Sequence, residues 1–303
     1  MSRPTRHLPV QLNEVLDVLR PRPGQIFVDC TLGLGGHSQA ILRRISPGGR
    51  LLAIDFDPEN ITSATARLRT VNNSFQIFHN NFAALPSVLS SAGVDRVDGL
   101  LADLGVASPQ IDNASRGFSY RHPGPLDMRM DTTRGVSAAG LLAKINEREL
   151  ASALLDLGDE TDAPKIARLI IERRKAQPIT TTEALAEIIC EARDFTMQRA
   201  AGAKLHPAAR SFQAIRMLVN REIPNLDRLL AVLPACLKPG ATAAIISFHS
   251  GEDRRVKNAF REGEREGLYE EISPDPITAT TEEQKDNPRS RSAKLRWARR
   301  AEL

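Results

Sequence analysis

Cysteine is scarce in this chain, and its few residues form no pattern. The 303 residues include three cysteines, Cys30, Cys190 and Cys236, which lie far apart without CxxC or neighbouring-histidine spacing. An odd number of widely separated cysteines favours neither a disulfide framework nor a zinc site. We therefore expect three buried thiols and no bound metal.

Long apolar runs are also missing. Hydrophobic residues make up 41% of the chain, but no stretch approaches the roughly 20 consecutive apolar residues that a membrane-spanning helix needs. The N-terminal sequence MSRPTRHLPVQLNEVL has basic residues but no apolar core of signal-peptide length. We expect a folded cytoplasmic protein with no membrane contact, built as one large domain or two ordinary ones.

Basic residues are in small excess over acidic ones. The formal net charge is +4, and the basic residues are unevenly distributed along the chain. The segment from Lys285 to Arg300, KDNPRSRSAKLRWARR, has seven basic residues against one acidic residue. Such a segment can bind phosphates, because neutralised phosphates release their counterions. It can equally be a solvated basic tail, which charge alone favours.

The first third of the chain alternates between strand-like and helix-like segments. Four short apolar runs predict strands: IFVDC, LLAIDFD, FQIFHN and VDGLLADLG. Helix-period segments lie between them at 36–45, 58–69 and 82–91, and Asp57-Pro58 supplies an N-cap and a first-turn proline. Repeated strand-helix-strand units indicate an α/β fold with an open, doubly wound, mostly parallel sheet.

The alternation of predicted strands and helices ends after Gly105. The segment VASPQIDNASRGFSYRHPGPLDMRMD has no clean period and is too long for an ordinary connection, which indicates a functional loop. Helical segments follow near 137–145, 147–157, 162–176 and 181–193. We therefore expect an all-helical insertion, the substrate-recognition domain, at 112–206, within a discontinuous α/β domain at 1–111 and 207–303.

The α/β pattern resumes in the last third. HPAARSFQAIRMLVNREIPNLDRLLAVLPACLKPG predicts two helices that end at Pro239-Gly240, and the strand ATAAIISF and the helix GEDRRVKNAFRE come next. LYEEIS and SAKLRWARR alternate weakly and can supply the last two strands, with an antiparallel edge.

The stretch DCTLGLGGHSQAIL, residues 29–42, places a glycine turn between the first predicted strand and the first helix. Glycines there let the backbone approach a ligand, and the helix N-terminus favours negative or polar groups. The spacing is Gly33-x-Gly35-Gly36, and the third position of the dinucleotide motif GxGxxG is occupied by Ser38. A tight turn without a ligand is the alternative.

Asp55 ends the second apolar run about 20 residues beyond the glycines, where an acidic side chain can accept hydrogen bonds from ribose hydroxyls. Both NAD and S-adenosylmethionine contain that ribose. Asp103 ends the fourth strand, where an acceptor can localise the lone pair of an exocyclic amino nitrogen such as N4 of cytosine and align it for methyl transfer. A helix or loop cap is the alternative role for Asp103.

Eight motifs in order carry a family resemblance over nearly the whole chain: DCTLGLGGHS, AIDFDP, DLGVASPQID, RGFSY, GPLDMRMD, HPAARSFQAIRMLVN, IISFHSGEDR and NPRSRSAKLR. With them the chain resembles the bacterial small-subunit (16S) ribosomal RNA cytosine-N4 methyltransferases. The resemblance implies a Rossmann-like α/β domain interrupted by a helical domain, with S-adenosylmethionine as cofactor. It also implies a cytidine of the decoding centre as substrate, presented by the assembled small ribosomal subunit.

The resemblance further implies the residues of the site. Asp103 is the expected catalytic residue, and the expected cofactor contacts are Gly35, Gly36, His37, Asp55, Phe82, Asp103 and Gln110. Ala107 and Gly251 depart from the family pattern, which usually has serine and leucine there. His249 can face the target base or be a structural histidine.

The long loop is the expected substrate side. Arg116, Arg121 and Arg129 can bind phosphates, and Phe118 or Tyr120 can stack on an unpaired base. The alternative is an ordered loop whose arginines pair with Asp127 and Asp131.

The expected function is methyl transfer to 16S rRNA, by a monomer or a homodimer. Two other functions remain open. An NAD-dependent dehydrogenase would share the glycine turn and Asp55, but it needs a second mononucleotide half that the sequence does not offer. A non-catalytic RNA-binding or assembly factor would keep the fold without activity. Methylation at cytosine C5 is disfavoured, because it normally needs a cysteine nucleophile.

Overall fold

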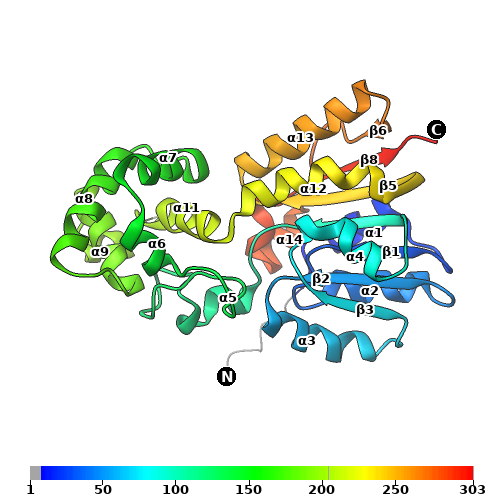
Figure 1. The fold of residues 1–303 in the computed structure, drawn as a ribbon, viewed down its shortest axis with the longest axis horizontal. Coiled ribbons are helices and arrows are strands. Elements are labelled where there is room, and N and C mark those ends of the chain that lie inside the picture. Colours follow the sequence, from blue (N-terminus) through cyan, green and yellow to red (C-terminus); the bar gives the residue numbers. More distant parts are fainter. Residues whose placement is uncertain (1–7, 204, 303) are drawn as a thin grey trace. The chain divides into compact units, whose positions relative to one another are not determined.

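Two compact units make up the chain in the computed structural model, which describes residues 8–203 and 205–302 (Figure 1). The sheet unit takes the described residues up to Gly105 and those from Ile223 onward, and the helical unit spans Val106–Glu222. The helix at 209–220, which we expected in the α/β domain, falls in the helical unit. Substrate recognition by the helical unit stays a prediction.

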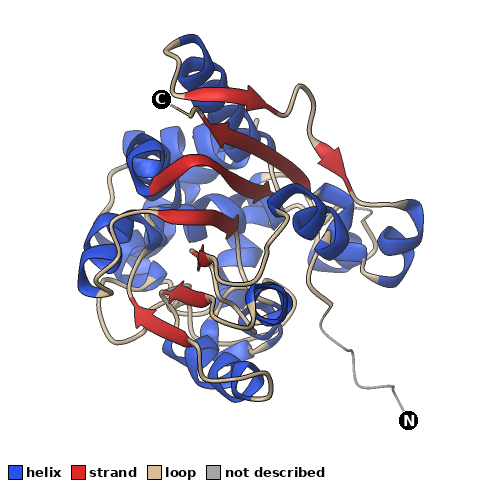
Figure 2. Ribbon diagram, turned by 90° about the vertical axis from the view of Figure 1, so that its right-hand side faces the viewer, coloured by secondary structure: helices blue, strands red, loops and turns tan. Residues whose placement is uncertain are grey.

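The sheet unit is built on one eight-stranded mixed sheet with the order β3-β2-β1-β4-β5-β8-β6, in which β7 also pairs with β8 (Figure 2). The first five strands in this order are parallel, and β8 is antiparallel to its neighbours β5, β6 and β7. The predicted α/β fold with a mostly parallel sheet is confirmed. The strands are β1 (Ile26–Asp29), β2 (Arg50–Asp55), β3 (Phe75–His79), β4 (Val97–Asp103), β5 (Leu237–Ser247), β6 (Tyr269–Ile272), β7 (Ile277–Thr278) and β8 (Lys294–Arg300).

Helices cover both faces of this sheet, as a doubly wound fold requires. Buried side chains of α1, α2 and α3 form the core on one face. Those of α4, α12 and α13 form the core on the other. The helices of this unit are α1 (Leu12–Leu19), α2 (Gly36–Ile45), α3 (Pro58–Arg69), α4 (Leu85–Ser91), α12 (Glu222–Cys236), α13 (Ser250–Arg265) and α14 (Thr281–Asp286), with 3-10 turns η1 (Phe82–Ala84) and η3 (Pro288–Ser292).

Local signals predicted most of these elements well. The helices expected at 36–45 and 58–69 have those bounds, and the Asp57 carboxylate accepts the Glu59 N–H (2.9 Å), as the predicted N-cap requires. The segment expected as one helix at 82–91 is divided into η1 and α4. Strand β5 begins at Leu237 and runs through Pro239-Gly240, where we had expected a helix to end. Helices α1 and α14 and strand β7 were not predicted.

The helical unit has its own apolar core. Its elements are α5 (Ser108–Asp112), η2 (Ala114–Arg116), α6 (Ala138–Lys144), α7 (Glu147–Gly158), α8 (Ala163–Ala176), α9 (Thr182–Ala192), α10 (Met197–Ala201) and α11 (Ala209–Asn220). The long loop is fixed to α11 through Asn220, whose side chain accepts the Met130 N–H (2.8 Å) and donates to the Met128 carbonyl (2.8 Å). The loop is therefore ordered by buried polar contacts.

Lys294–Arg300 of the basic C-terminal segment form strand β8 of the sheet, so the solvated-tail interpretation is wrong for these residues. Arg296 is buried and donates to Asp253 of α13 (2.6 Å), and Lys294 lies 3.5 Å from the same carboxylate. Arg299 pairs with Glu271 of the neighbouring strand (2.9 Å). These cations stabilise the junction of β8 with α13 and β6.

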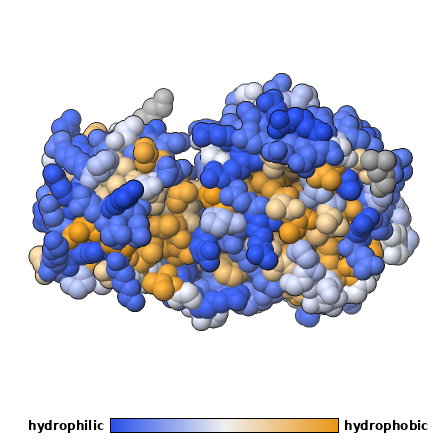
Figure 3. All heavy atoms as spheres, turned by 45° about the horizontal axis from the view of Figure 1, so that its top comes forward, coloured by the Kyte–Doolittle hydropathy of each residue, from blue (hydrophilic) through white to orange (hydrophobic). Residues whose placement is uncertain are grey.

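Polar residues predominate on the face of the molecule drawn in Figure 3, with apolar residues gathered in patches between them. The large apolar side chains most exposed are Leu8, Val136, Leu155, Met197 and Leu205. All three cysteines are buried thiols. None of the described helices is long and apolar enough to cross a bilayer.

Gly99 offers a test of the sheet packing. A Cβ atom at Gly99 would lie 2.2 Å from Cε1 of Phe27, whose ring is fully buried in the neighbouring strand. We expect Gly99→Ala to lower the free energy of unfolding of the sheet unit by about 1–3 kcal/mol, because an overpacked core must shift. Urea denaturation would measure this.

Phe27→Leu supplies the control, since the smaller side chain makes room for the added methyl group. The double variant should then be more stable than the sum of the two single changes implies, by about 0.5 kcal/mol or more. Wild-type stability in Gly99→Ala would contradict the packing argument.

Candidate functional site

The carboxyl ends of the parallel strands converge on one edge of the sheet. Strand β1 lies between β2 and β4, and β4 pairs with β5, so Asp29, Asp55 and Asp103 end three neighbouring strands. Ligands of doubly wound sheets bind at this edge, outside the strand ends. This edge of the sheet unit is the candidate site.

The glycine turn connects β1 to α2 at this edge. Gly33 and Gly35 have φ values of +51° and +75°, in the left-handed region that favours glycine. A Cβ at Gly35 would lie 3.1 Å from Cβ of Ala64 in α3, and a Cβ at Gly36 would lie 3.1 Å from the ring of Pro9. Backbone conformation and internal packing therefore require these glycines, in addition to any ligand.

Asp55 fixes the conformation of the turn from the neighbouring strand. Its Oδ2 accepts the Gly33 N–H (2.7 Å), and its Oδ1 accepts the Asp57 N–H (2.8 Å) and an Asn60 side-chain N–H (3.3 Å). The side chain is nearly buried, and this burial raises the pKa of Asp55 to about 6 against the three hydrogen bonds, which lower it. Each carboxylate oxygen has two lone pairs, so Oδ2 keeps capacity for one more donor.

Phe82 follows the end of β3, and Asn80, two residues before it, is hydrogen-bonded to Asp55. The Asn80 N–H donates to the Asp55 carbonyl (3.0 Å), and the Asn81 side chain caps η1 by accepting the Ala83 N–H (2.8 Å). The Phe82 ring is partly buried against the core of α4 and α12. The structure thus brings Phe82 to the edge that holds the glycine turn and Asp55.

Asp103 is anchored through its backbone and not through its carboxyl group. Its N–H donates to Thr31 Oγ1 (2.6 Å), whereas Oδ1 is buried and has no hydrogen-bond partner among the described residues. Burial raises the pKa of Asp103 well above its usual range, and the carboxyl groups of Asp29 and Glu252 raise it further. The alternative role as a cap is not what the described contacts show.

The two neighbouring carboxyl groups differ from Asp103 because both have donors. Asp29 accepts the Ser38 hydroxyl (2.6 Å) and the Thr31 N–H (3.0 Å), while its burial raises its pKa. Glu252 accepts the Phe248 N–H (3.0 Å). Of the three acids, Asp103 is the one whose side chain no described donor reaches within hydrogen-bond distance.

His37 lies between the N-terminal segment and Asp103. Its Nε2 is 2.8 Å from the Val10 carbonyl, and its Nδ1 is 3.7 Å from Asp103 Oδ2. Burial lowers the pKa of His37 to about 4 against the effect of Val10. A carbonyl only accepts, so the neutral ring carries its proton on Nε2 and presents Nδ1 as an acceptor to Asp103.

Val10 is itself held by a distant part of the chain. The Gln11 N–H donates to Glu283 Oε1 (2.8 Å), the Gln11 side chain donates to the Ile277 carbonyl (2.8 Å), and Asn287 donates to the Leu8 carbonyl (3.2 Å). Residues 8–11 therefore form a strap that connects the segment around β7 and α14 to the His37 ring.

Gln110 belongs to the helical unit, in helix α5. Its Oε1 accepts the Ala107 N–H (2.7 Å), which caps the helix, and its side chain is buried. Ala107 occupies the N-cap position without a side-chain acceptor, where a serine would supply one. The predicted cofactor contact of Gln110 stays a prediction.

His249 begins helix α13 in a capping role. Its Nδ1 lies 3.4 Å from the Glu252 N–H, and its Nε2 lies 3.2 Å from Glu252 Oε1. A Cβ at Gly251 already lies 3.2 Å from His249 Nδ1. A leucine at position 251 would crowd this ring, so the glycine gives His249 room.

The long loop uses most of its arginines internally. Arg116 is buried and donates to the carbonyls of Arg129 and Met130 (3.1 and 2.9 Å). Arg129 forms a salt bridge with Asp127 (2.7 Å), and Arg134 pairs with Asp131. The alternative of an ordered loop with an arginine–aspartate pair holds for Arg129, and Arg116 is buried on loop carbonyls, so neither side chain is directed to a phosphate in this structure.

The aromatic residues of the loop divide in the same way. Phe118 is 8% exposed and packs in the core of the helical unit, so it is not available to stack on a base. Tyr120 stacks on His206 with ring centroids 4.3 Å apart, and the exposed Arg121 guanidinium lies 5.8 Å from the Tyr120 ring. Tyr120, His206 and Arg121, which we call the aromatic-arginine cluster, remain open to a ligand.

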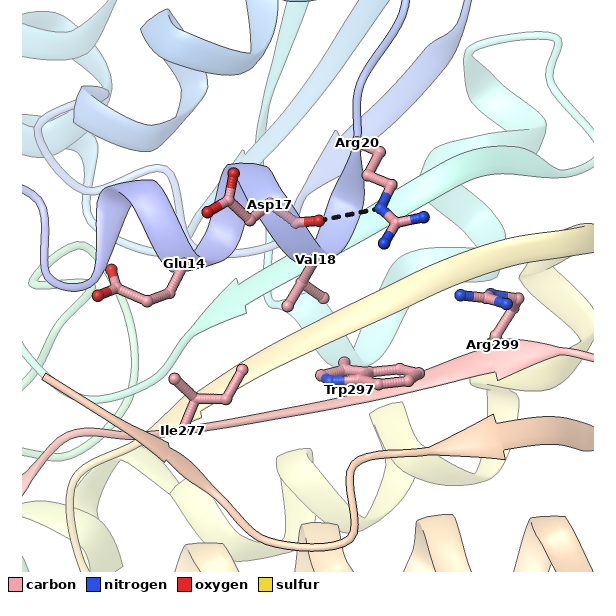
Figure 4. Close-up of a pocket in the computed structure, with 7 residues that line it drawn as sticks. All are labelled: Glu14, Asp17, Val18, Arg20, Ile277, Trp297 and Arg299. Carbon is pink, nitrogen blue, oxygen red and sulfur yellow. Dashed lines mark hydrogen bonds between the residues drawn. The ribbon is translucent and has the colours of Figure 1, made fainter.

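A separate cavity of about 230 Å³ lies between α1 and strands β7 and β8. Figure 4 shows the Trp297 ring beneath Val18, with the side chains of Arg20 and Arg299 on the right of the view. Trp297 and Arg299 are in register with Ala244 and Thr242, toward the amino end of β5. None of the residues that line the cavity is a predicted site residue.

Sequence reasoning missed the residues that surround Asp103. Asp29, Thr31 and Ser38 stand within the glycine stretch at 29–42, but the hydrogen bond from Asp103 to Thr31 depends on the pairing of β1 with β4. Glu252 was visible only as a first-turn acid of a helix. A polar residue at the end of each parallel strand was the available signal.

The raised pKa of Asp55 predicts a pH dependence of stability. The folded protein holds the Asp55 proton up to about pH 6, whereas the unfolded chain releases it near pH 4. The free energy of unfolding therefore falls as pH rises from 4 to 6, by about 3 kcal/mol for a shift of two units.

Asp55→Asn removes this titration and isolates it from other groups. The stability of the wild type relative to Asp55→Asn should fall between pH 4 and pH 7, as measured by urea denaturation at each pH. A difference that is constant with pH, or that rises, would contradict the raised pKa.

Comparison with known proteins agrees with this arrangement. The sequence profile described as the MraW methylase family matches residues 4–301. The chain is 45% identical to ribosomal RNA small subunit methyltransferase H of Methylibium petroleiphilum, over 99% of this chain and 97% of the relative. It is 46% identical to the protein of the same name from Chromobacterium violaceum, again over 99% and 97%.

Solved structures give a more distant likeness. A SAM-dependent methyltransferase from Aquifex aeolicus aligns at 10% identity with a TM-score of 0.43, over 99% of this chain and 94% of that one. The family assignment depends on the sequence matches, which cover the whole arrangement of glycine turn, strand ends and helical unit. The chain belongs to the MraW methylase family.

Proposed function

We propose that this protein transfers a methyl group from S-adenosylmethionine to N4 of a cytidine in 16S ribosomal RNA, in the decoding centre of the small subunit. The observation that carries the proposal is the Asp103 carboxyl group, whose Oδ1 is buried at the carboxyl edge of the sheet without a described partner. A buried acceptor left unpaired costs free energy. A substrate amino group is a donor that would satisfy it.

The residues at this edge fit S-adenosylmethionine. The turn at Gly35, Gly36 and His37 would hold the methionine part, Asp55 would accept from the ribose through Oδ2, and Phe82 would flank the adenine. The carboxyl groups of Asp29 and Glu252 lie close enough to Asp103 to raise its pKa, and negative potential from these two groups favours a cationic ligand. Gln110 of α5 is a further proposed cofactor contact.

The bound cofactor supplies a methyl group activated by a sulfonium. The chain's own contribution is to orient the amino nitrogen: Asp103 Oδ1 accepts one N–H, which localises the nitrogen lone pair in the direction of the methyl group. Such alignment accounts for a large part of catalysis in transfers between two bound reactants. Cysteine chemistry is not involved, because Cys30, Cys190 and Cys236 are buried thiols and cytosine C5 methylation needs an accessible one.

The substrate side is proposed to be the helical unit, which would bind 16S rRNA within the small ribosomal subunit in the cytoplasm. The target cytidine must leave its stack to reach an amino-group acceptor. The aromatic-arginine cluster suits an unpaired nucleotide, because bases stack on aromatic rings and arginines pair with phosphates. Either a monomer or a homodimer could present these elements.

An NAD-dependent dehydrogenase and a non-catalytic assembly factor are the competing functions. Isothermal titration separates the first, since binding of NAD without binding of S-adenosylmethionine would overturn the proposal. The second would bind RNA and S-adenosylmethionine without turnover.

Ribosomal RNA from cells that lack the protein tests the substrate directly. Digestion and mass spectrometry should show the loss of one N4-methylcytidine from 16S rRNA, and re-expression of the wild type should restore it. An unchanged set of modified cytidines would overturn the specific activity proposed.

Arg121 tests the RNA contact. Arg121→Gln should weaken binding to small-subunit RNA and reduce the slope of log affinity against log salt by about one, because one phosphate contact is lost. Filter binding over a salt series would measure this.

Arg148→Gln is the matched control, since it removes an exposed arginine of α7 outside the aromatic-arginine cluster. Equal effects of the two substitutions would mean that Arg121 contributes only general charge.

A further inference from the structure

Asp103 stands in a cluster of acids in which the three members are not equivalent. Asp29 accepts donors from Ser38 and Thr31, and Glu252 accepts the Phe248 N–H. Hydrogen bonds from N–H and O–H groups favour the charged form of a carboxyl group, and neighbouring carboxylates oppose ionisation of one another. The member without donors is therefore the one that keeps a proton.

His37 determines which oxygen of Asp103 holds that proton. The Val10 carbonyl, 2.8 Å from Nε2, requires the Nε2–H tautomer, which leaves Nδ1 as an acceptor 3.7 Å from Asp103 Oδ2. That separation is a few tenths of an ångström beyond a hydrogen bond, and active-site hydrogen bonds commonly shorten when ligands bind. On the other side of the carboxyl group, Oδ1 has no described donor or acceptor.

We infer that Asp103 works as an uncharged acid, with its proton directed to His37 Nδ1 from Oδ2 and its Oδ1 left as a pure acceptor for the substrate amino group. The inference rests on the proposed function and deepens it. His37 is a positioning residue here: it acts on the substrate only through Asp103. The backbone of His37 remains free to line the cofactor, as proposed above.

The proton balance differs from that of a general base. Methylation of an amino nitrogen forms an N–C bond and breaks the C–S bond, with the electron pair of the latter going to sulfur. The nitrogen then releases one proton. In this arrangement Asp103 keeps its own proton throughout and the released proton goes to solvent. An amide side chain could therefore replace the carboxyl group, with its oxygen toward the substrate and its N–H toward His37.

The groups that face Asp103 all belong to this arrangement. They are Asp29 of β1, His37 of α2 and Glu252 of α13, and His249 lies beside Glu252. Burial raises the pKa of Asp103 and lowers that of His37, so both shifts favour the uncharged form of the group. These directions agree with the hydrogen-bond pattern from which the inference is drawn.

Infrared difference spectroscopy tests the proton without substrate or turnover. The spectrum of the wild type minus that of Asp103→Asn, at pH 7, should contain the C=O band of a protonated carboxyl group. The wild type alone should lose this band at alkaline pH, which keeps the test valid if the variant folds poorly. Asp95→Asn, at an exposed carboxyl before β4, is the matched control and should leave the band in place. A wild type that lacks the band would overturn the inference.

Methyl transfer supplies the second arm. Asp103→Asn should keep kcat within about tenfold of the wild type, whereas Asp103→Ala should lose about 100-fold, comparable to loss of one oriented hydrogen-bonding group at a reacting centre. His37→Leu should lower kcat about tenfold and shift the carboxyl band. Asp103→Asn as inactive as Asp103→Ala, with normal cofactor binding, would show an ionised base and overturn the inference.

A failure of the proposed function can be distinguished from a failure of the inference about the Asp103 proton. A wild type that methylates no cytidine would overturn the activity, while the infrared band would still decide whether Asp103 holds a proton.

Discussion

The buried carboxylate of Asp29 connects the elements on which the site depends. Through Ser38 it is bonded to the first turn of α2, and through Thr31 to the turn after β1. The Thr31 hydroxyl in turn accepts the backbone N–H of Asp103 at the end of β4. Without this acceptor, three elements would lose their common polar partner, and buried donors would be left unpaired at a cost of about 1–3 kcal/mol each.

Much of this fold could be predicted from local signals. Helices α2 and α3 begin at a glycine turn and at Asp57-Pro58, which are start signals that act within four residues. The parallel strands follow from their apolar runs and from the helices between them. Helix α1 escaped prediction because its N-cap residue, Gln11, has a left-handed backbone conformation and provides no side-chain cap. Its position depends on packing against the sheet, which a local pattern does not reveal.

The site residues could be predicted where the residue type and its place at a strand end determine its role. They could not be predicted where the role depends on the hydrogen-bond partners of the side chain. Asp55 and Asp103 end strands, and position in a parallel sheet brings strand ends together. Arg116 and Arg129 look like phosphate ligands in the sequence because both are cations in a polar loop. Their partners, the carbonyls of the loop and the Asp127 carboxylate, become visible only when the loop is folded on Asn220.

The strap at residues 8–11 links two parts of the chain that lie far apart in the sequence. Gln11 and Glu283 are 272 positions apart, and contacts of such separation form late, because the loop that they close is long. The contacts that hold residues 8–11 are made by Ile277, Glu283 and Asn287, which lie 266 to 279 positions away in the sequence. The orientation of a histidine in the first turn of α2 is thus tied to a segment that contributes no residue to the predicted site.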